Sequence, residues 1–293
     1  MVTSLKDIGS MFRQYQNSDY NLIYNFLIEI NKDKSHLNWQ WGRFEWMMEH
    51  PLFDKANASK IGLWLEEDKL VGLAIFDMYF GEVSCLTLKG YEHLYQEILT
   101  YAYEELKDDN GLGVAINKND QLSIKISLSL GFNKYEQKEV MMEFDLSKLE
   151  KVNLPHGYHF EEFNEEKDVE AVQWVFYQGF GHGNDYNEFL KTLAKIEKRP
   201  HFNSFLASFV SNEEEKVAYC SLWYDLSTDY AYLEPLCVIP GARNQGIAKA
   251  LVYELLGRVK SLGAKYVYVL SDMEFYEKLG FKKVQEYNFY WKK

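Results

Sequence analysis

The segment that decides the fold reads LEPLCVIPGARNQGIAKAL and runs from Leu233 to Leu251. Its apolar first half predicts a strand, and the apolar spacing after Gly246 is typical of an amphipathic helix. A short loop therefore leads from a strand directly into the start of a helix. The first amides of a helix lack intrahelical partners and carry partial positive charge, so this junction suits a phosphate group. Gly246 has no Cβ that would keep an anion from the backbone.

Three loop motifs compete for this junction. A P-loop would require Gly-Lys followed by Ser or Thr, but Gly246 is followed by Ile247. A dinucleotide fingerprint would require G-x-G-x-x-G, which is also absent. The remaining pattern is Arg243-x-x-Gly246-x-Ala248 after an apolar strand, and Arg243 and Lys249 add positive charge. The alternative is a structural loop that only caps a helix.

The pattern resembles the R/Q-x-x-G-x-G/A acyl-CoA signature of the GNAT superfamily of N-acetyltransferases. The resemblance extends to Val238-x-Pro240 before the loop and to Lys249-x-Leu251 after it. It extends further to FYEKLGF at residues 275–281, a segment common in the same superfamily. The similarity covers residues 157–293, about half of the chain.

The resemblance implies acetyl-CoA as co-substrate, bound where two neighbouring parallel strands splay apart. An amine would then attack the thioester carbon directly. Loop amides would hold the pyrophosphate, and the strand backbone would pair with the pantetheine. The implied acetyl-CoA-binding residues are Leu236, Cys237, Val238, Arg243, Asn244, Gln245, Gly246, Ala248 and Lys249.

Two side chains have implied chemical roles. Tyr276 occupies the general-acid position of the family, where a phenol protonates the departing thiolate; the alternative is a core aromatic residue. Glu234 lies on the strand that enters the site, and a carboxylate there would serve as general base because a protonated ammonium cannot attack. The alternative for Glu234 is a solvated or salt-bridged strand residue. Asp225, Asp229 and Tyr232 are weaker candidates for the base.

The second half of the chain predicts the element order βααβββαβαβ, which fits the fold of that superfamily. The strands are expected at residues 157–163, 204–211, 216–225, 230–239, 264–270 and 281–291. The helices are expected at residues 166–177, 188–196, 246–262 and 272–279. The segment 146–155 lacks a sustained period and predicts a linker.

The two halves of the chain repeat each other. SLGFNK at residues 129–134 resembles KLGFKK at 278–283, and KLVGLAI at 69–75 resembles KVAYCSL at 216–222. Both offsets are close to half the chain, which favours a duplication over a coincidence between two α/β domains. We therefore expect an α/β protein with two GNAT-like domains, 1–150 and 151–293. Each would be a mixed, mostly antiparallel twisted sheet flanked by helices.

The first half lacks the chemistry of the second. Its corresponding region, 85–94, contains no R-x-x-G-x-G/A, and Ser127 stands at the position that corresponds to Tyr276. We expect a degenerate domain that covers the sheet edge of the second half and helps to shape the acceptor pocket. The aromatic stretch 39–48 favours a core stripe over a pocket wall.

Composition excludes several classes of function. The chain of 293 residues has a formal net charge of −12, which disfavours nucleic-acid binding and a tRNA-dependent transferase of the Fem type. Three cysteines without CxxC spacing predict neither a disulfide framework nor a zinc site. No apolar run reaches the ~18 residues of a membrane span, and no signal peptide is recognisable, so a cytoplasmic setting is expected.

The sequence thus predicts an acetyl-CoA-dependent N-acetyltransferase with one active site, in its second half. The acceptor would be a small-molecule amine, with no nucleic acid or membrane partner, and the chain would be a monomer or a homodimer. The alternative is a non-catalytic acyl-CoA-binding or sensor protein that keeps the loop without turnover.

Overall fold

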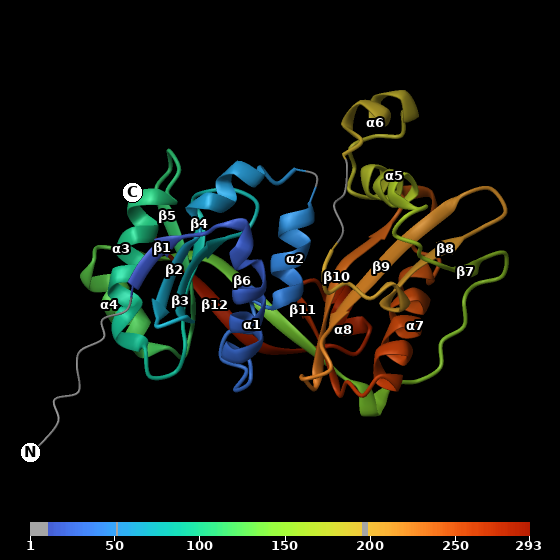
Figure 1. Cartoon of the computed structure of the whole chain (residues 1–293). Coiled ribbons are helices and arrows are strands. Elements are labelled where there is room, and N and C mark those ends of the chain that lie inside the picture. The colour runs from blue at the N-terminus through green and yellow to red at the C-terminus, as the bar shows by residue number, and fades with distance from the viewer. Residues whose placement is uncertain (1–10, 51, 195–198) are drawn as a thin grey trace, which may run out of the picture. The chain divides into compact units, whose positions relative to one another are not determined.

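The structure is a computed structural model that describes residues 11–50, 52–194 and 199–293 (Figure 1). The helices are α1 (Tyr20–Ile30), α2 (Trp41–Glu49), α3 (Tyr95–Glu105), α4 (Gln121–Ser129), α5 (Val169–Gly179), α6 (Tyr186–Thr192), α7 (Ile247–Ser261) and α8 (Glu274–Lys278). The strands are β1 (Met11–Gln14), β2 (Gly62–Glu66), β3 (Lys69–Phe76), β4 (Glu82–Thr87), β5 (Leu112–Asn117), β6 (Asn133–Asp145), β7 (His159–Glu162), β8 (Ala207–Ser211), β9 (Lys216–Tyr224), β10 (Tyr230–Val238), β11 (Tyr266–Leu270) and β12 (Lys282–Lys292).

The chain divides into two compact units. Among the described residues, the first unit comprises 11–48, 52–140 and 285–293, and most of the second comprises 141–284. These units differ from the continuous halves 1–150 and 151–293 that we expected from the sequence. The difference lies mainly in two strands, each of which contributes residues to both units.

Each unit contains a mixed, mostly antiparallel sheet, as predicted. In the first unit the strand order is β1-β2-β3-β4-β5-β12, and β4–β5 is the parallel pair among antiparallel neighbours. In the second unit the order is β6-β11-β10-β9-β8-β7, and β10–β11 is the parallel pair. The two sheets therefore repeat one topology, which agrees with the repeat found in the sequence.

The two exchanged strands are β6 and β12. Residues 287–292 of β12 pair with β5 of the first unit, and residues 141–145 of β6 pair with β11 of the second. The last strand of each half of the sequence thus completes the sheet of the other unit. The strand patterns could not predict this exchange, because alternation of apolar residues specifies which face of a strand is buried but not which neighbour it pairs with.

The elements of the second unit lie close to the predicted ranges. The expected strand 230–239 is β10, and the expected helix 246–262 is α7. The helix expected at 188–196 is α6, which ends at Thr192; residues 195 and 196 of that prediction lie outside the described residues. Helices α5 and α7 both pack on β9 and β10, so these strands form the centre of the unit.

Large aromatic side chains fill the core of the second unit, including Trp223, Tyr219 and Tyr268, each at most 1% exposed. Burial of such side chains contributes most of the stability of a domain of this size. No helix of the described ranges is both long enough and apolar enough to cross a membrane.

Candidate active site

The parallel strands β10 and β11 pair over only three residues. Tyr230, Ala231 and Tyr232 pair with β11, whereas the remainder of β10 has no partner strand on that side among the described residues. On its other side β10 stays paired with β9 up to Val238. The two strands therefore splay apart after Tyr232, and the expected V-shaped opening is present. Leu236 and Val238 are half-buried along this edge.

A β-bulge lies at the point of divergence. The register between β10 and β9 shifts between Leu233 and Leu236, and the Glu234–Pro235 peptide bond is cis. Two donors from β9 fix the bulge, because Ser221 Oγ and Trp223 Nε1 donate to the Glu234 carbonyl oxygen at 2.8 and 2.7 Å. A bulge of this kind redirects a side chain relative to the regular strand.

The Glu234 carboxylate has a defined donor. Tyr232 lies two residues earlier on the same strand, and its hydroxyl donates to Glu234 Oε2 at 2.7 Å. Sequence reasoning considered Tyr232 only as a competing base and missed this contact. The available signal was the i, i+2 spacing, which places two side chains on one face of a strand.

The loop after β10 presents unpaired backbone amides. Asn244 and Gly246 have positive φ angles of 60° and 83°, and the first backbone bond of α7 runs from the Ala250 amide to the Gly246 oxygen at 3.0 Å. The amides of residues 246–249 have no backbone acceptor within the described part of the chain, whereas the turn at residues 243–244 uses the amide of residue 245. A Cβ added to Gly246 would meet no atom within 4 Å. Open space therefore lies beside donors that suit an anion.

Arg243 has a different environment from the one expected. Its Nε donates to the Val238 oxygen at 3.0 Å, and its Nη2 donates to the Gly179 oxygen at 2.5 Å. Gly179 is the last residue of α5, so the guanidinium lies at the partially negative end of that helix. Arg243 thus links the end of α5 to the end of β10 through hydrogen bonds. The sequence did not predict this contact.

The side chains of Gln245 and Lys249 also lie against other residues of the second unit. Gln245 donates to the Gly241 oxygen at 3.2 Å and accepts a bond from the Tyr158 hydroxyl at 3.1 Å. Lys249 Nζ lies 5.4 Å from the centre of the Tyr253 ring. Ala248 is half-buried in the first turn of α7. The side chain of Gln245 therefore stabilises the loop that precedes α7.

Cys237 is a structural residue. Its side chain is 3% exposed, and its Sγ lies 3.4 Å from the Val175 oxygen of α5. A Cβ added to Gly179 would meet this sulfur at 2.0 Å, so α5 packs directly on the cysteine. Burial raises the pKa of the Cys237 thiol to about 12. A thiol that is protonated at neutral pH is a poor nucleophile.

Tyr276 lies on the short helix α8 and is 8% exposed. Its ring packs against Phe275 and Phe281, with ring centres 5.1 and 5.6 Å apart. Burial raises the pKa of the phenol, and the charge of Glu234 raises it further. The phenol is therefore protonated at neutral pH and lies within electrostatic reach of Glu234. The two predicted catalytic side chains therefore both belong to the second unit, and the charge of Glu234 acts on the Tyr276 phenol.

The comparisons with known proteins agree with this geometry. The model of the acetyltransferase (GNAT) family matches residues 167–281, which contain the splayed strands, the loop and Tyr276. These residues form a GNAT domain. None of the curated proteins in the comparison matches the sequence.

Solved structures show the same fold over the whole chain. A GCN5-related N-acetyltransferase from Sphaerobacter thermophilus is 14% identical, with a TM-score of 0.59 over 99% of this chain and 96% of its own. A tandem GNAT protein from the clavulanic acid biosynthesis pathway is 10% identical, with a TM-score of 0.61 over 96% and 98%. A GNAT-family acetyltransferase from Colwellia psychrerythraea is 15% identical, with a TM-score of 0.56 over 96% and 100%. The chain thus has the tandem GNAT fold.

Proposed function

We propose that the protein is an acetyl-CoA-dependent N-acetyltransferase that acetylates the amine of a small molecule, with its active site in the second unit. One observation carries this proposal: the unpaired amides of residues 246–249 lie beside the open space at Gly246, in the loop that follows the diverging strands β10 and β11. The loop amides could donate to the pyrophosphate of acetyl-CoA, and the free edge of β10 could pair with its pantetheine arm. Acetyl-CoA would supply the acetyl group as a thioester.

Two residues of the second unit would catalyse the transfer of the acetyl group, one as general base and one as general acid. Glu234 accepts the proton that the amine loses, so that the nitrogen lone pair forms the new bond to the acetyl carbon. The carbon–sulfur bond breaks as the amide forms, and the Tyr276 hydroxyl donates a proton to the departing thiolate. Holding the reactants in contact lowers the barrier by itself, which agrees with a direct transfer that needs no acyl-enzyme. Tyr232 keeps the Glu234 carboxylate in place through its 2.7 Å bond.

The cofactor assignment is tested by thermal unfolding of the full chain with and without acetyl-CoA. A ligand that binds only the folded state raises the melting temperature by mass action. Gly246→Glu should abolish this rise, because a carboxylate would occupy the open space beside the loop amides. Gly257→Glu, inside α7 and also in open space, controls for the added carboxylate and should keep the rise. A chain that shows no rise with millimolar acetyl-CoA would contradict the assignment.

A further inference from the structure

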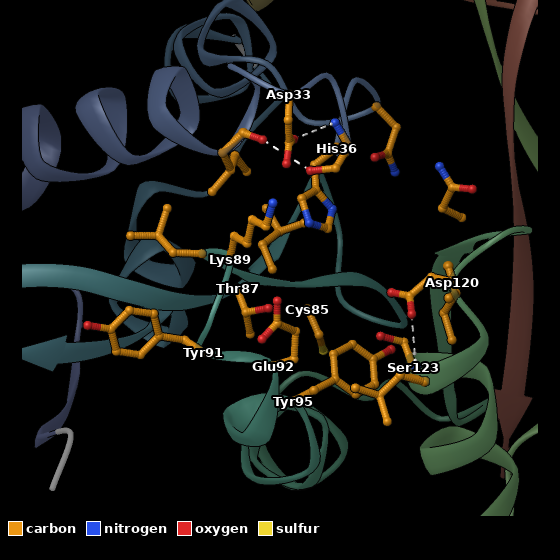
Figure 2. A pocket seen from close by; sticks show the side chains of 18 of the residues that line it. Asp33, His36, Cys85, Thr87, Lys89, Tyr91, Glu92, Tyr95, Asp120 and Ser123 are labelled. Atoms are coloured by element: carbon orange, nitrogen blue, oxygen red, sulfur yellow. Dashed lines mark hydrogen bonds between the residues drawn. The ribbon is translucent and has the colours of Figure 1, made fainter.

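The first unit contains a cavity of its own, with a volume of about 650 Å³ (Figure 2). It opens where the parallel strands β4 and β5 diverge, because they pair only at Glu82–Gly113 and Val83–Val114. Cys85 and Thr87 line it from β4, and Asn117 lines it from β5. The volume lies within the range of small-molecule sites. The first unit thus keeps a pocket at the position that corresponds to the opening in the second unit.

The mouth of this cavity differs chemically from the loop of the second unit. Both carboxylate oxygens of Glu92 accept bonds from the Gly90 amide, at 2.9 and 3.0 Å. These bonds, and one from its own amide, hold the pKa of Glu92 below its usual range. A fixed negative charge therefore lies just before helix α3, where the second unit offers free amides. A pyrophosphate is repelled from this position.

A second carboxylate faces the interior of the cavity. His36, Cys85, Tyr95 and Asp120 all line this cavity, and the charge of Asp120 acts on both His36 and Tyr95 (Figure 2). Burial lowers the pKa of His36, which leaves the imidazole neutral at neutral pH. Asp120 caps α4 through one oxygen, which accepts a bond from the Ser123 amide at 3.0 Å. Its second oxygen is available to a ligand.

Three lysines and four carboxylates line the cavity, and Asp120 is not ion-paired with any of these lysines. Lys32 pairs with Glu29 at 2.5 Å, and Lys89 lies close enough to lower the pKa of Glu92. Asp120 forms no ion pair with the residues that the structure describes. The other charged residues that line the cavity are Asp33 and Lys69.

An unpaired acceptor also lines the cavity. Asn38 is 2% exposed, and its Nδ2 donates to Glu139 at 2.9 Å. Its Oδ1 is buried and has no hydrogen-bond partner within the described part of the chain. A buried acceptor without a donor is costly, and a ligand that donates a hydrogen bond removes that cost. Asn38 and Asp120 can both accept a hydrogen bond from a ligand, and the negative charge of Asp120 favours a positively charged donor.

We propose that the cavity of the first unit binds a small primary amine that carries no phosphate, with its ammonium group at Asp120. This site is separate from the acetyl-CoA site proposed for the second unit and does not depend on it. Its chemistry follows from three observations: the Glu92 carboxylate at the mouth, the Asp120 carboxylate inside, which is not ion-paired with the lining lysines, and the unpaired Asn38 acceptor.

The test is calorimetric titration of the full chain with ethanolamine, putrescine and spermidine, and with 1,4-butanediol as an uncharged probe. At least one amine should bind, and the diol should not. Asp120→Asn should weaken amine binding by about tenfold or more, because a charge-assisted hydrogen bond is replaced by a neutral one. Asparagine is as good a helix cap as aspartate, so α4 should stay folded. Asp54→Asn is the matched control, because Asp54 caps another turn of this unit through the Ala56 amide at 3.0 Å.

The Gly246→Glu chain separates this proposal from the proposed function. Amine binding should persist in that variant, and acetyl-CoA binding should be absent from it. The proposal is overturned if none of the amines binds, or if the amines bind the wild type and Asp120→Asn equally. Acetyl-CoA binding that persists in Gly246→Glu would contradict only the proposed function. A wild-type chain that binds amines through Asp120 but not acetyl-CoA would contradict only the proposed function.

Discussion

Glu234 is held at both its backbone and its side chain. Ser221 and Trp223 fix its carbonyl oxygen, and the Tyr232 hydroxyl binds its carboxylate. Such positioning matters for a general base, since a small displacement from the reacting proton lowers the rate steeply. The sequence alone indicated Glu234 through its place on the strand. It did not indicate the three supporting donors, because two of them lie on the neighbouring strand.

Tyr276→Phe tests the general acid. The change removes one oxygen and keeps the ring that packs against Phe281. We expect kcat to fall by about 10²–10⁴-fold, the usual contribution of a positioned acid, with little change in acetyl-CoA binding. Steady-state thiol release gives kcat, and the melting shift with acetyl-CoA reports binding. An unchanged kcat would remove Tyr276 from the mechanism.

Tyr232→Phe tests whether Tyr232 positions the base. Loss of its hydroxyl removes a bond that favours the charged carboxylate, so the acid limb of the pH–rate profile should move to higher pH. Glu234→Gln should instead lower kcat by about 10²-fold or more on the plateau of the profile and remove the acid limb, because an amide cannot accept the proton. The measurement is kcat/KM as a function of pH for the three chains. A Tyr232→Phe profile that coincides with the wild type would contradict the positioning role.

At the scale of elements, α5 packs directly on β10 at Gly179. Gly179→Ala should destabilise the fold by about 1–3 kcal/mol, since its Cβ would meet Cys237 Sγ at 2.0 Å and the helix would have to move. Gly257→Ala, in α7 with no atom within 4 Å, should instead be stabilising by about 0.5–1 kcal/mol. Urea unfolding of both variants measures the difference. Equal effects would show that α5 does not pack as described.

Local sequence patterns predicted most of the helices and strands. They predicted the contacts between these elements less well. The hairpins β2–β3 and β8–β9 follow from apolar runs separated by acidic turns, and the loop before α7 follows from its glycine and its apolar spacing. The Arg243–Gly179 bond joins residues far apart in the sequence, which no local pattern records. The exchange of β6 and β12 escaped prediction for the same reason.

At the scale of the whole molecule, one fold carries two chemically different sites. The second unit leaves the amides before α7 free, whereas the first unit binds its own Glu92 at the corresponding position before α3. The sequence showed that the first half lacks the acyl-CoA signature. It did not show that a cavity remains there, because a cavity depends on the divergence of two strands rather than on any motif.

The three cysteines should all be unreactive in the folded chain. Burial raises the pKa of Cys85, Cys220 and Cys237, so each keeps its proton as the pH rises past the ordinary thiol value of about 8.5. The unfolded chain releases those protons in that range, so the free energy of unfolding should fall as the pH rises above it. Labelling with Ellman's reagent at about pH 8 should be slow without urea and complete with it. Rapid labelling of the native chain would contradict the described burial.

The most direct test of the central claim is thiol release from acetyl-CoA in the presence of a panel of small primary amines, followed by mass spectrometry of the products. Glu234, Tyr276 and the loop amides all belong to the second unit, so the wild type should acetylate at least one amine. Gly246→Glu should lose this turnover, and Gly257→Glu should retain it. Acetyl-CoA binding without turnover of any amine would contradict the claim, as would equal turnover by Gly246→Glu and the wild type.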